Sequence, residues 1–308
     1  MGALERSYAH CGRVARLASS NFYYCLFLLP VEKRQAMYAL YAFLRQVDDI
    51  ADGPAAETSD GPVHSDADCQ RRLVELATLR ENLHRSLTSE VHDPILPALA
   101  DTVRRYGIPT TYLDAAIDGV SMDLHGERYE TFDELSIYCQ RVAGVVGQAC
   151  IHIWGFNDPR ALELAVPCGL AFQLTNILRD LKDDALQGRV YLPAEDLRRF
   201  EYTADELRAG VRDARFRRLM QFQIARAEQL YGASQHLGQM LHADGRRVFL
   251  AMFRTYHRLL EEICLAQGDV FSRRVSLSLW QKATIALGSI WPRSGMSYTP
   301  VDVKAPSA

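Results

Sequence analysis

The sequence predicts an all-α fold, and three observations support this. Apolar residues recur with the spacing of one helix face along most of the chain, whereas the alternation typical of strands is scarce. Helix-start signals are frequent. Two residue pairs have the spacing of a capping box, Thr131 with Glu134 and Thr203 with Glu206. In such a box each side chain can satisfy an exposed backbone donor at the helix start.

The predicted helices follow one another along the chain with short connections. Their expected ranges are 32–52, 68–88, 93–105, 110–122, 132–154, 158–184, 212–240, 242–267 and 273–288. No Gly/Ser/Pro-rich linker long enough to separate two cores interrupts this series. We therefore expect a single domain over residues 1–290. Residues 291–308 contain three prolines and scattered polar residues, and we expect a loosely ordered C-terminal tail there.

The segment 53–68 contains two Gly-Pro pairs, several acids and almost no large apolar residues, which predicts an exposed loop. It directly follows the first acidic motif described below. It is therefore either a lid over a site or an ordinary surface connection.

Composition excludes several classes of function. With 35 basic and 38 acidic residues the net charge is -3, so the chain lacks the basic footprint of a nucleic-acid-binding protein. The seven cysteines are odd in number and include no CxxC pair, which favours reduced thiols in a cytoplasmic protein. The N-terminus lacks the pattern of a signal peptide, and no uninterrupted apolar run reaches the roughly 18 residues of a membrane span. We expect at most peripheral membrane attachment.

The first predicted helix carries an acidic face. Tyr41, Arg45, Asp48 and Asp52 occupy positions i, i+4, i+7 and i+11, which fall on one narrow face of an α-helix. Apolar residues occupy another face of the same helix. Asp49 lies beside this acidic face.

The helix predicted at 158–184 repeats the arrangement. Gln173, Asn176, Asp180 and Asp184 share one face, flanked by a leucine and isoleucine stripe. Carboxylates at i and i+4 repel one another, so such a face favours a cation. Oxygen ligands without neighbouring His or Cys indicate Mg²⁺, which commonly bridges carboxylates to phosphate oxygens. A single DxxxD pattern is usually a solvated helix face, but two such helices favour a metal and diphosphate site.

Arginines accompany both acidic faces. Arg45 lies on the first, and Arg179 and Arg189 flank the second. The forked guanidinium group suits phosphate oxygens, although each arginine could equally form a surface ion pair. Together they fit a diphosphate site.

With these residues in view, the chain closely resembles the squalene/phytoene synthase family of head-to-head (1'-1) prenyl transferases. The resemblance covers nearly the whole chain. Its motifs include Ser19-Ser-Asn-Phe22, Ala39-Leu-Tyr41-Ala-Phe, Asp48-Asp-Ile-Ala-Asp52, Tyr138-Cys-Gln-Arg-Val-Ala-Gly144, Gln173-Leu-Thr-Asn176-Ile-Leu-Arg-Asp180, Gly188-Arg189-Val-Tyr191-Leu-Pro193 and Arg273-Arg274-Val. One departure is Asn21, where many relatives have Ser.

The resemblance implies an isoprenoid-synthase helical bundle around a central apolar cavity, with the two acidic helices facing each other at its mouth. It also implies roles for single residues. The implied Mg²⁺ ligands are Asp48, Asp49, Asp52, Asn176, Asp180 and Asp184. The implied diphosphate contacts are Arg45, Gln173, Arg179, Arg189, Tyr256, Arg273 and Arg274, and the catalytic positions are Ser19, Tyr41 and Tyr129.

The implied reaction begins with ionisation of an allylic diphosphate, whose charge Mg²⁺ and arginines would stabilise while an apolar cavity excludes water. The segment from Ser19 to Asp52 resembles bacterial squalene-pathway members of the family more than it resembles phytoene synthases. We therefore expect farnesyl diphosphate as substrate and presqualene diphosphate as product, with NADPH as reductant if the reaction continues to squalene. The alternative is a phytoene synthase that joins two geranylgeranyl diphosphates.

Two rival classes stay open. A terpene cyclase or prenyl diphosphate hydrolase could use a related bundle, and some members of the superfamily resemble non-catalytic assembly factors with decayed acidic motifs. The intact carboxylates at Asp48, Asp52, Asp180 and Asp184 argue against an assembly factor. His152 and His257 lie in apolar helices, where a hydrogen-bonded structural histidine is the usual reading. Oligomeric state is not predicted.

Overall fold

The computed structural model describes residues 2–17, 23, 25–51, 53, 56–58, 61–63, 66–290 and 299–300. The fold is all-α, as predicted, apart from one short hairpin. The α-helices are α1 (Ala3–Leu17), α3 (Val31–Ala51), α4 (Asp66–Thr88), α5 (Leu96–Tyr106), α6 (Thr110–Leu124), α7 (Phe132–Cys139), α8 (Val145–Trp154), α9 (Arg160–Leu186), α10 (Ala194–Arg199), α11 (Ala204–Arg208), α12 (Ala214–Ser234), α13 (Leu237–Met240), α14 (Ala243–Leu265) and α15 (Leu279–Ile290). The described residues also form a 3₁₀ turn, η1 (Leu26–Leu28), and a π-helical turn, η2 (Gln140–Gly144).

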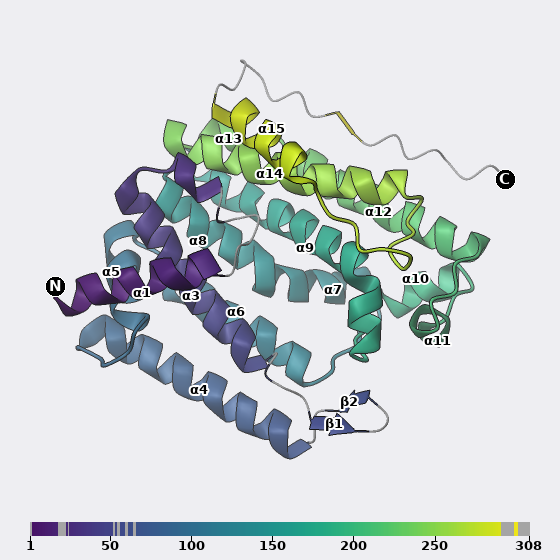
Figure 1. Ribbon diagram of the computed structural model, residues 1–308, viewed down its shortest axis with the longest axis horizontal. Helices are drawn as coiled ribbons and strands as arrows, with labels where there is room; N and C mark the ends of the chain where they lie inside the picture. Colours follow the sequence, from purple (N-terminus) through teal and green to yellow (C-terminus); the bar gives the residue numbers. More distant parts are fainter. Residues whose placement is uncertain are drawn as a thin grey trace.

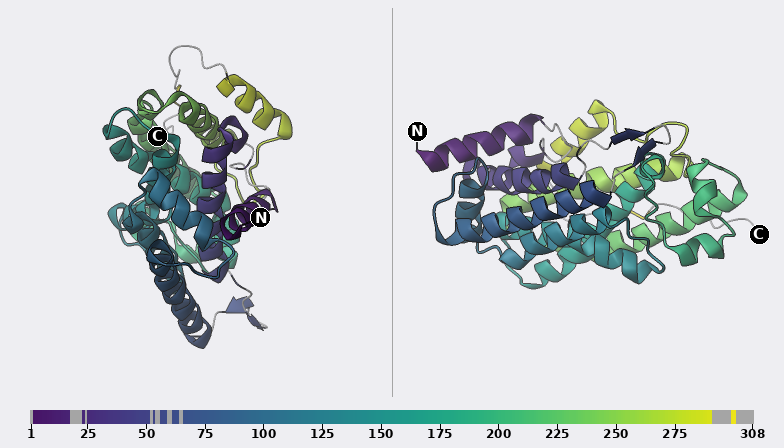
Figure 2. Two further views of the ribbon diagram at one scale, coloured as in Figure 1. Left: turned by 90° about the vertical axis from the view of Figure 1, so that its left-hand side faces the viewer. Right: turned by 90° about the horizontal axis from the view of Figure 1, so that it is seen from below.

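The long helix α9 runs through the middle of the bundle and packs against α8, α12, α14 and η2 (Figure 1). On the other side, α3 packs against α1, α5 and α6, and α4 covers α5 and α6. The views in Figure 2 show the helices lying roughly along the long axis of the molecule. The buried apolar side chains form one contiguous cluster that spans these helices. This arrangement places the two acidic helices, α3 and α9, in one bundle.

The predicted helix 132–154 is continuous but contains the π-helical turn η2 between α7 and α8. Glycines of the neighbouring helices permit its close packing. A Cβ on Gly169 of α9 would lie 2.7 Å from the backbone of Ala143, and a Cβ on Gly119 of α6 would lie 2.7 Å from the Val142 side chain. Both distances are shorter than real Cβ contacts allow. Glycine at these two positions therefore lets α6 and α9 approach the turn that lines the cavity described below.

The segment predicted as an exposed loop contains a two-stranded antiparallel hairpin, β1 (Ala56–Thr58) and β2 (Gly61–Val63). Each strand has three residues, too few for an alternating pattern to be recognised in the sequence. The last helix starts at Leu279 rather than at residue 273. The Ser278 hydroxyl accepts a hydrogen bond from the backbone N–H of Gln281, and the Gln281 side-chain oxygen accepts one from the backbone N–H of Ser278, which marks this start. The predicted ranges include no helix at α1, α10 or α11, although the capping-box spacing of Thr203 and Glu206 marked the start of α11.

Of the two capping boxes, the one at Thr203 and Glu206 is complete. At Thr131 only half forms. The Thr131 hydroxyl accepts from the backbone of Glu134, while the Glu134 carboxylate accepts from the backbone N–H of Glu130 instead of the N–H of Thr131. Both sites start helices, as predicted.

One described helix, α9, is long and apolar enough to cross a membrane by length and composition. Half of its apolar window is buried inside the bundle. Core helices pass the same test, so this property is weak evidence for a membrane span.

Candidate functional site

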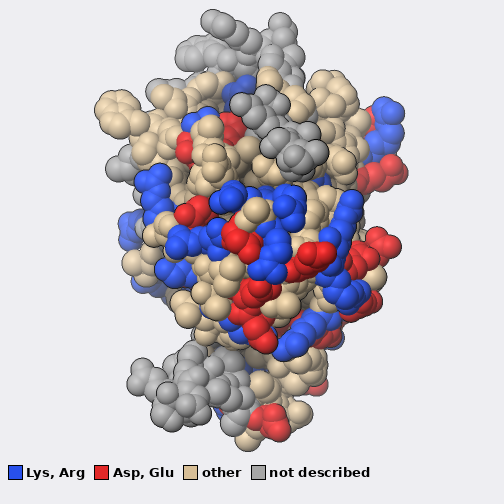
Figure 3. All heavy atoms as spheres, turned by 90° about the vertical axis from the view of Figure 1, so that its right-hand side faces the viewer, with Lys and Arg blue, Asp and Glu red and all other residues tan. Residues whose placement is uncertain are grey.

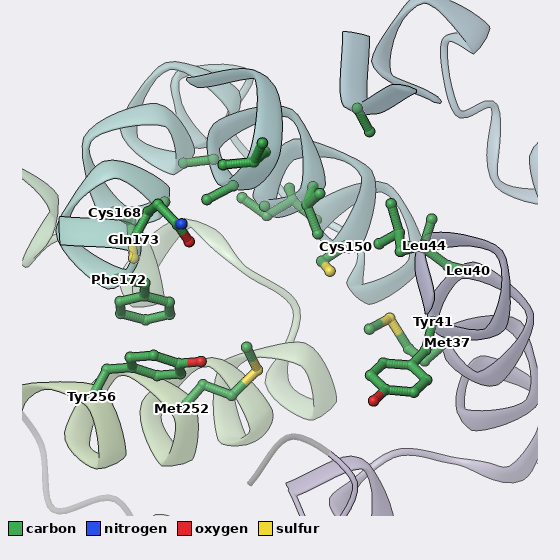
Figure 4. A pocket seen from close by; sticks show the side chains of 18 of the residues that line it. Met37, Leu40, Tyr41, Leu44, Cys150, Cys168, Phe172, Gln173, Met252 and Tyr256 are labelled. Carbon is green, nitrogen blue, oxygen red and sulfur yellow. The ribbon is translucent and has the colours of Figure 1, made fainter. Parts of the chain in front are cut away.

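A cavity with a volume of about 320 Å³ lies between α3, α6, α8, α9 and α14. Its walls are mainly apolar and sulfur-containing side chains, with polar groups contributed by Tyr41, Arg45 and Asp48 from α3 and by Gln173 and Asn176 from α9. Figure 4 shows side chains of α3 on one side of the cavity and those of α9 and α14 on the other. The structure thus brings the two predicted acidic helices to one cavity.

The first acidic face reaches the cavity through Tyr41, Arg45 and Asp48. Asp49 forms an ion pair with Arg45 at 2.6 Å and lies on a neighbouring polar cleft, outside the cavity lining. Asp52 lies outside the described residues, as does the predicted catalytic Ser19. The metal role expected for Asp49 stays a prediction.

The second acidic face begins with Gln173 and Asn176, which are about one turn apart. The Asn176 amide nitrogen lies 3.5 Å from the Gln173 side-chain oxygen. The side-chain oxygen of Asn176 is buried and has no hydrogen-bond partner among the described residues. A buried acceptor without a donor is costly, and a cation would satisfy it. This observation fits the predicted role of Asn176 as a metal ligand.

Asp180 is held by two arginines. Arg179 donates to both carboxylate oxygens, at 2.8 Å from Nε to one of them, and Arg274 donates from Nε at 3.0 Å. Arg274 reaches α9 from the turn before α15 and also lies 3.9 Å from Asp183. These forked groups are the donors that a diphosphate oxygen would use. The predicted grouping of Asp180, Arg179 and Arg274 is therefore present.

Asp184 lies one turn further along α9, and its pKa is raised. Burial and the negative charge of Asp180 raise the pKa of Asp184 to about 7, although the positive charge of Arg189 opposes this shift. Two neighbouring carboxylates repel one another when both are ionised, so the pKa of one of them rises. Raised acid pKa values are typical of sites that bind a cation or move a proton.

Asp123, at the end of α6, is a further acid that sequence reasoning missed. Its carboxylate accepts hydrogen bonds from the hydroxyls of Tyr138 at 3.0 Å and Tyr191 at 2.8 Å. Its charge contributes to the raised pKa of Asp184, so the two acids are close. The signal available in the sequence was a single acid between apolar residues at a helix end, which does not distinguish a site from a surface position.

The predicted catalytic Tyr129 is buried in the same tyrosine cluster. Its ring centroid lies 5.6 Å from that of Tyr138 and 6.4 Å from that of Tyr191. The hydroxyls that bind Asp123 are those of Tyr138 and Tyr191, and the lining of the cavity does not include Tyr129. Burial raises the pKa of all three tyrosines, so they are neutral hydrogen-bond donors at ordinary pH.

Tyr256 of α14 lines the cavity, as expected for a diphosphate contact. Its ring stacks on Phe172 with a centroid distance of 4.4 Å and an interplanar angle of 9° (Figure 4). Arg189 lies near Asp184, while Arg273 is exposed. Trp154 also lines the cavity, whereas His257 is a buried structural histidine paired with Glu228.

Charged side chains of both signs gather on the face seen in Figure 3, at the end of the molecule that holds α10 and α11 in Figure 1. The C-terminal ends of α3 and α9 point toward this end in Figure 1. Among the described residues, no three His, Cys, Asp or Glu side chains are grouped closely enough to hold a metal ion by themselves.

Comparisons with known proteins agree with this geometry. The family model described as squalene/phytoene synthase matches residues 15–281. The phytoene synthase of Arthrospira platensis is 35% identical over 289 residues, which cover 90% of each chain. The phytoene synthase of Mycobacterium tuberculosis is 35% identical over 293 residues, which cover 94% of this chain and 92% of the relative.

Two solved structures share the fold. A dehydrosqualene synthase in complex with ligand superposes with a TM-score of 0.79 at 25% identity, covering 93% of this chain and 96% of that one. A squalene synthase from Alicyclobacillus acidocaldarius gives a TM-score of 0.77 at 26% identity, covering 86% and 95%. The residues matched by the family model, 15–281, include both acidic helices and all the residues that line the cavity. The chain therefore belongs to the squalene/phytoene synthase family of prenyl transferases, whose substrates are isoprenoid diphosphates.

Proposed function

We propose that this protein joins two geranylgeranyl diphosphates head to head, in a Mg²⁺-dependent reaction that leads to phytoene. The observation that carries the proposal is the apolar cavity to which both acidic helices, α3 and α9, contribute polar groups. Such a site can hold a diphosphate beside one helix while a long apolar chain lies in the cavity. The identity to proteins named phytoene synthase supports the C20 substrate.

The chain's own residues have three tasks in this mechanism. Asp48, Asn176 and Asp180 would hold Mg²⁺, which when bound neutralises the diphosphate leaving group. Arg179 and Arg274 donate hydrogen bonds to Asp180, and from these positions their N–H groups would donate to the diphosphate oxygens when it is bound. The apolar walls exclude water, so that the allylic cation is attacked by the second substrate rather than by solvent.

Proton loss closes the cyclopropyl intermediate, and a nearby basic group is needed to accept that proton. Asp123 is a candidate because its carboxylate is held by the hydroxyls of Tyr138 and Tyr191 and lies close to Asp184. The diphosphate itself is a competing acceptor.

The C20 substrate replaces the farnesyl diphosphate expected from the N-terminal motifs. Relatives named phytoene synthase are 33–35% identical over about nine-tenths of the chain. The two squalene-type structures are 25–26% identical. The structural similarity to these squalene-type enzymes supports a second candidate reaction. This reaction condenses two farnesyl diphosphates to presqualene diphosphate and can continue to squalene.

Product analysis distinguishes the two candidates. The purified protein is incubated with Mg²⁺ and either geranylgeranyl or farnesyl diphosphate, with and without NADPH. We expect a C40 hydrocarbon from geranylgeranyl diphosphate without need for NADPH. A C30 product from farnesyl diphosphate, with no C40 product under matched conditions, would assign the protein to the squalene type instead.

A further inference from the structure

Arg72 of α4 is a fully buried arginine that is not among the residues lining the cavity. Its Nε donates to the Asp68 carboxylate at 2.8 Å. One terminal nitrogen donates to the backbone carbonyl of Ala51, and the other donates at 2.9 Å to the carbonyl of Gly53. All three nitrogens of the guanidinium group therefore have acceptors, and two of these acceptors belong to the chain that leaves α3.

The position of these carbonyls matters because α3 ends at Ala51. The last carbonyls of a helix have no partner within the helix and carry its partial negative charge. In α3 this end also carries Asp48 and Asp49, and Asp52 follows in the sequence. Clustered carboxylates at the negative end of a helix disfavour the helical state, so the end of α3 needs an external constraint.

The neighbouring Arg71 shows that this arrangement is specific to position 72. Arg71 is exposed and pairs with Asp68 and Glu75 on the surface of α4. Arg72 instead directs both terminal nitrogens to the backbone on either side of position 52. Its ion pair with Asp68 fixes the plane of the guanidinium group, and the planar fork then sets the spacing of the two carbonyls.

We propose that Arg72 is a positioning residue for the first acidic motif. By holding the carbonyls of Ala51 and Gly53, it keeps the end of α3 in the geometry in which Asp48 can share a metal with a diphosphate. It acts through the backbone and touches neither metal nor substrate. This inference rests on the metal site of the proposed function.

The test compares R72Q and R72K with R71Q as the matched control, since Arg71 shares the helix and the partner Asp68. Turnover is measured against Mg²⁺ concentration. Metal binding is measured separately by electron paramagnetic resonance of Mn²⁺ with inorganic diphosphate. We expect R72Q to raise the half-saturating metal concentration about 10- to 100-fold, as loss of groups that orient metal ligands commonly does, with kcat recovering at saturating metal. R72K should be intermediate, because an ammonium group cannot reproduce the planar fork. R71Q should match the wild type.

Several results would overturn the inference. A folded R72Q with wild-type metal dependence would show that Arg72 does not position the motif. An equal loss of kcat at every metal concentration would show a general structural role. If R72Q does not fold, R72K decides by the same two measurements, with helical content checked by circular dichroism. Metal-independent turnover of the wild type would instead refute the proposed metal chemistry itself.

Discussion

At the scale of single residues, the candidate metal ligands are carboxylates and one amide on α3 and α9. Asp180 is held by Arg179 and Arg274, and the side-chain oxygen of Asn176 is buried without a donor among the described residues. Asp48 is exposed at the end of α3. None of these groups fills a packed apolar core position. Their replacement should therefore affect chemistry more than folding.

We predict that Asp48→Asn and Asp180→Asn each lower kcat by about two to three orders of magnitude, because each removes charge that would hold the metal beside the diphosphate. Helical content measured by circular dichroism should not change. Asp183→Asn is the control, since Asp183 is exposed and its ion pair with Arg274 is long, at 3.9 Å. Excess chelator should abolish wild-type turnover. Loss of helical content in either variant would identify the carboxylate as structural.

At the scale of elements, α12 and α14 are joined by a buried ion pair. His257 of α14 lies 2.9 Å from the Glu228 carboxylate of α12 and 3.3 Å from the Glu261 carboxylate of its own helix. Arg258 also binds Glu261. Burial alone would lower the pKa of His257, but the hydrogen bonds to the two glutamates outweigh it and raise the pKa to about 9. The same helix presents Tyr256 to the cavity.

This ion pair predicts a pH dependence of stability. A histidine whose pKa is higher in the folded than in the unfolded protein stabilises the fold fully below about pH 6.5, and the contribution is lost as pH rises through about 9. Raising the pH from 6 to 10 should therefore lower the unfolding free energy of the wild type more than that of His257→Gln, by up to about 3 kcal/mol. Urea unfolding at both pH values measures this difference.

The control is His236→Gln, which changes an exposed histidine and should keep the wild-type pH dependence. An equal loss of stability in the wild type and His257→Gln would mean that the pair is not charged in the folded protein.

At the scale of the whole molecule, the family's substrates carry long apolar chains, and large apolar side chains are exposed on the surface. Trp280 at the start of α15 is 82% exposed, and Leu17, Phe27 and Leu265 are also exposed. Exposed apolar groups can contact a lipid surface.

We expect the protein to divide between cytosol and membrane fractions, with the membrane share released by high salt, carbonate or mild detergent. Trp280→Ser should reduce the share that binds to lipid vesicles. Recovery of the protein only in membranes, resistant to salt and carbonate washes, would contradict peripheral attachment.

The sequence alone determined the features that depend on local spacing. The periodicity of apolar residues predicted the main helices, and the spacing of Asp48, Asn176 and Asp180 predicted acidic faces, because these patterns follow from the pitch of a single helix. The motifs also predicted the family. The division into one domain and a tail stays a prediction, and most of that tail lies outside the described residues.

Other features required the tertiary structure, because they join residues far apart in the chain. The pairing of Asp180 with Arg274 spans 94 residues, and the bond from Tyr191 to Asp123 spans 68. Arg72 looks like its neighbour Arg71 in the sequence, yet only the packing of α4 against α3 buries it on the backbone carbonyls of Ala51 and Gly53. A local pattern can place a side chain on a helix face, but which partner it meets depends on how the helices pack.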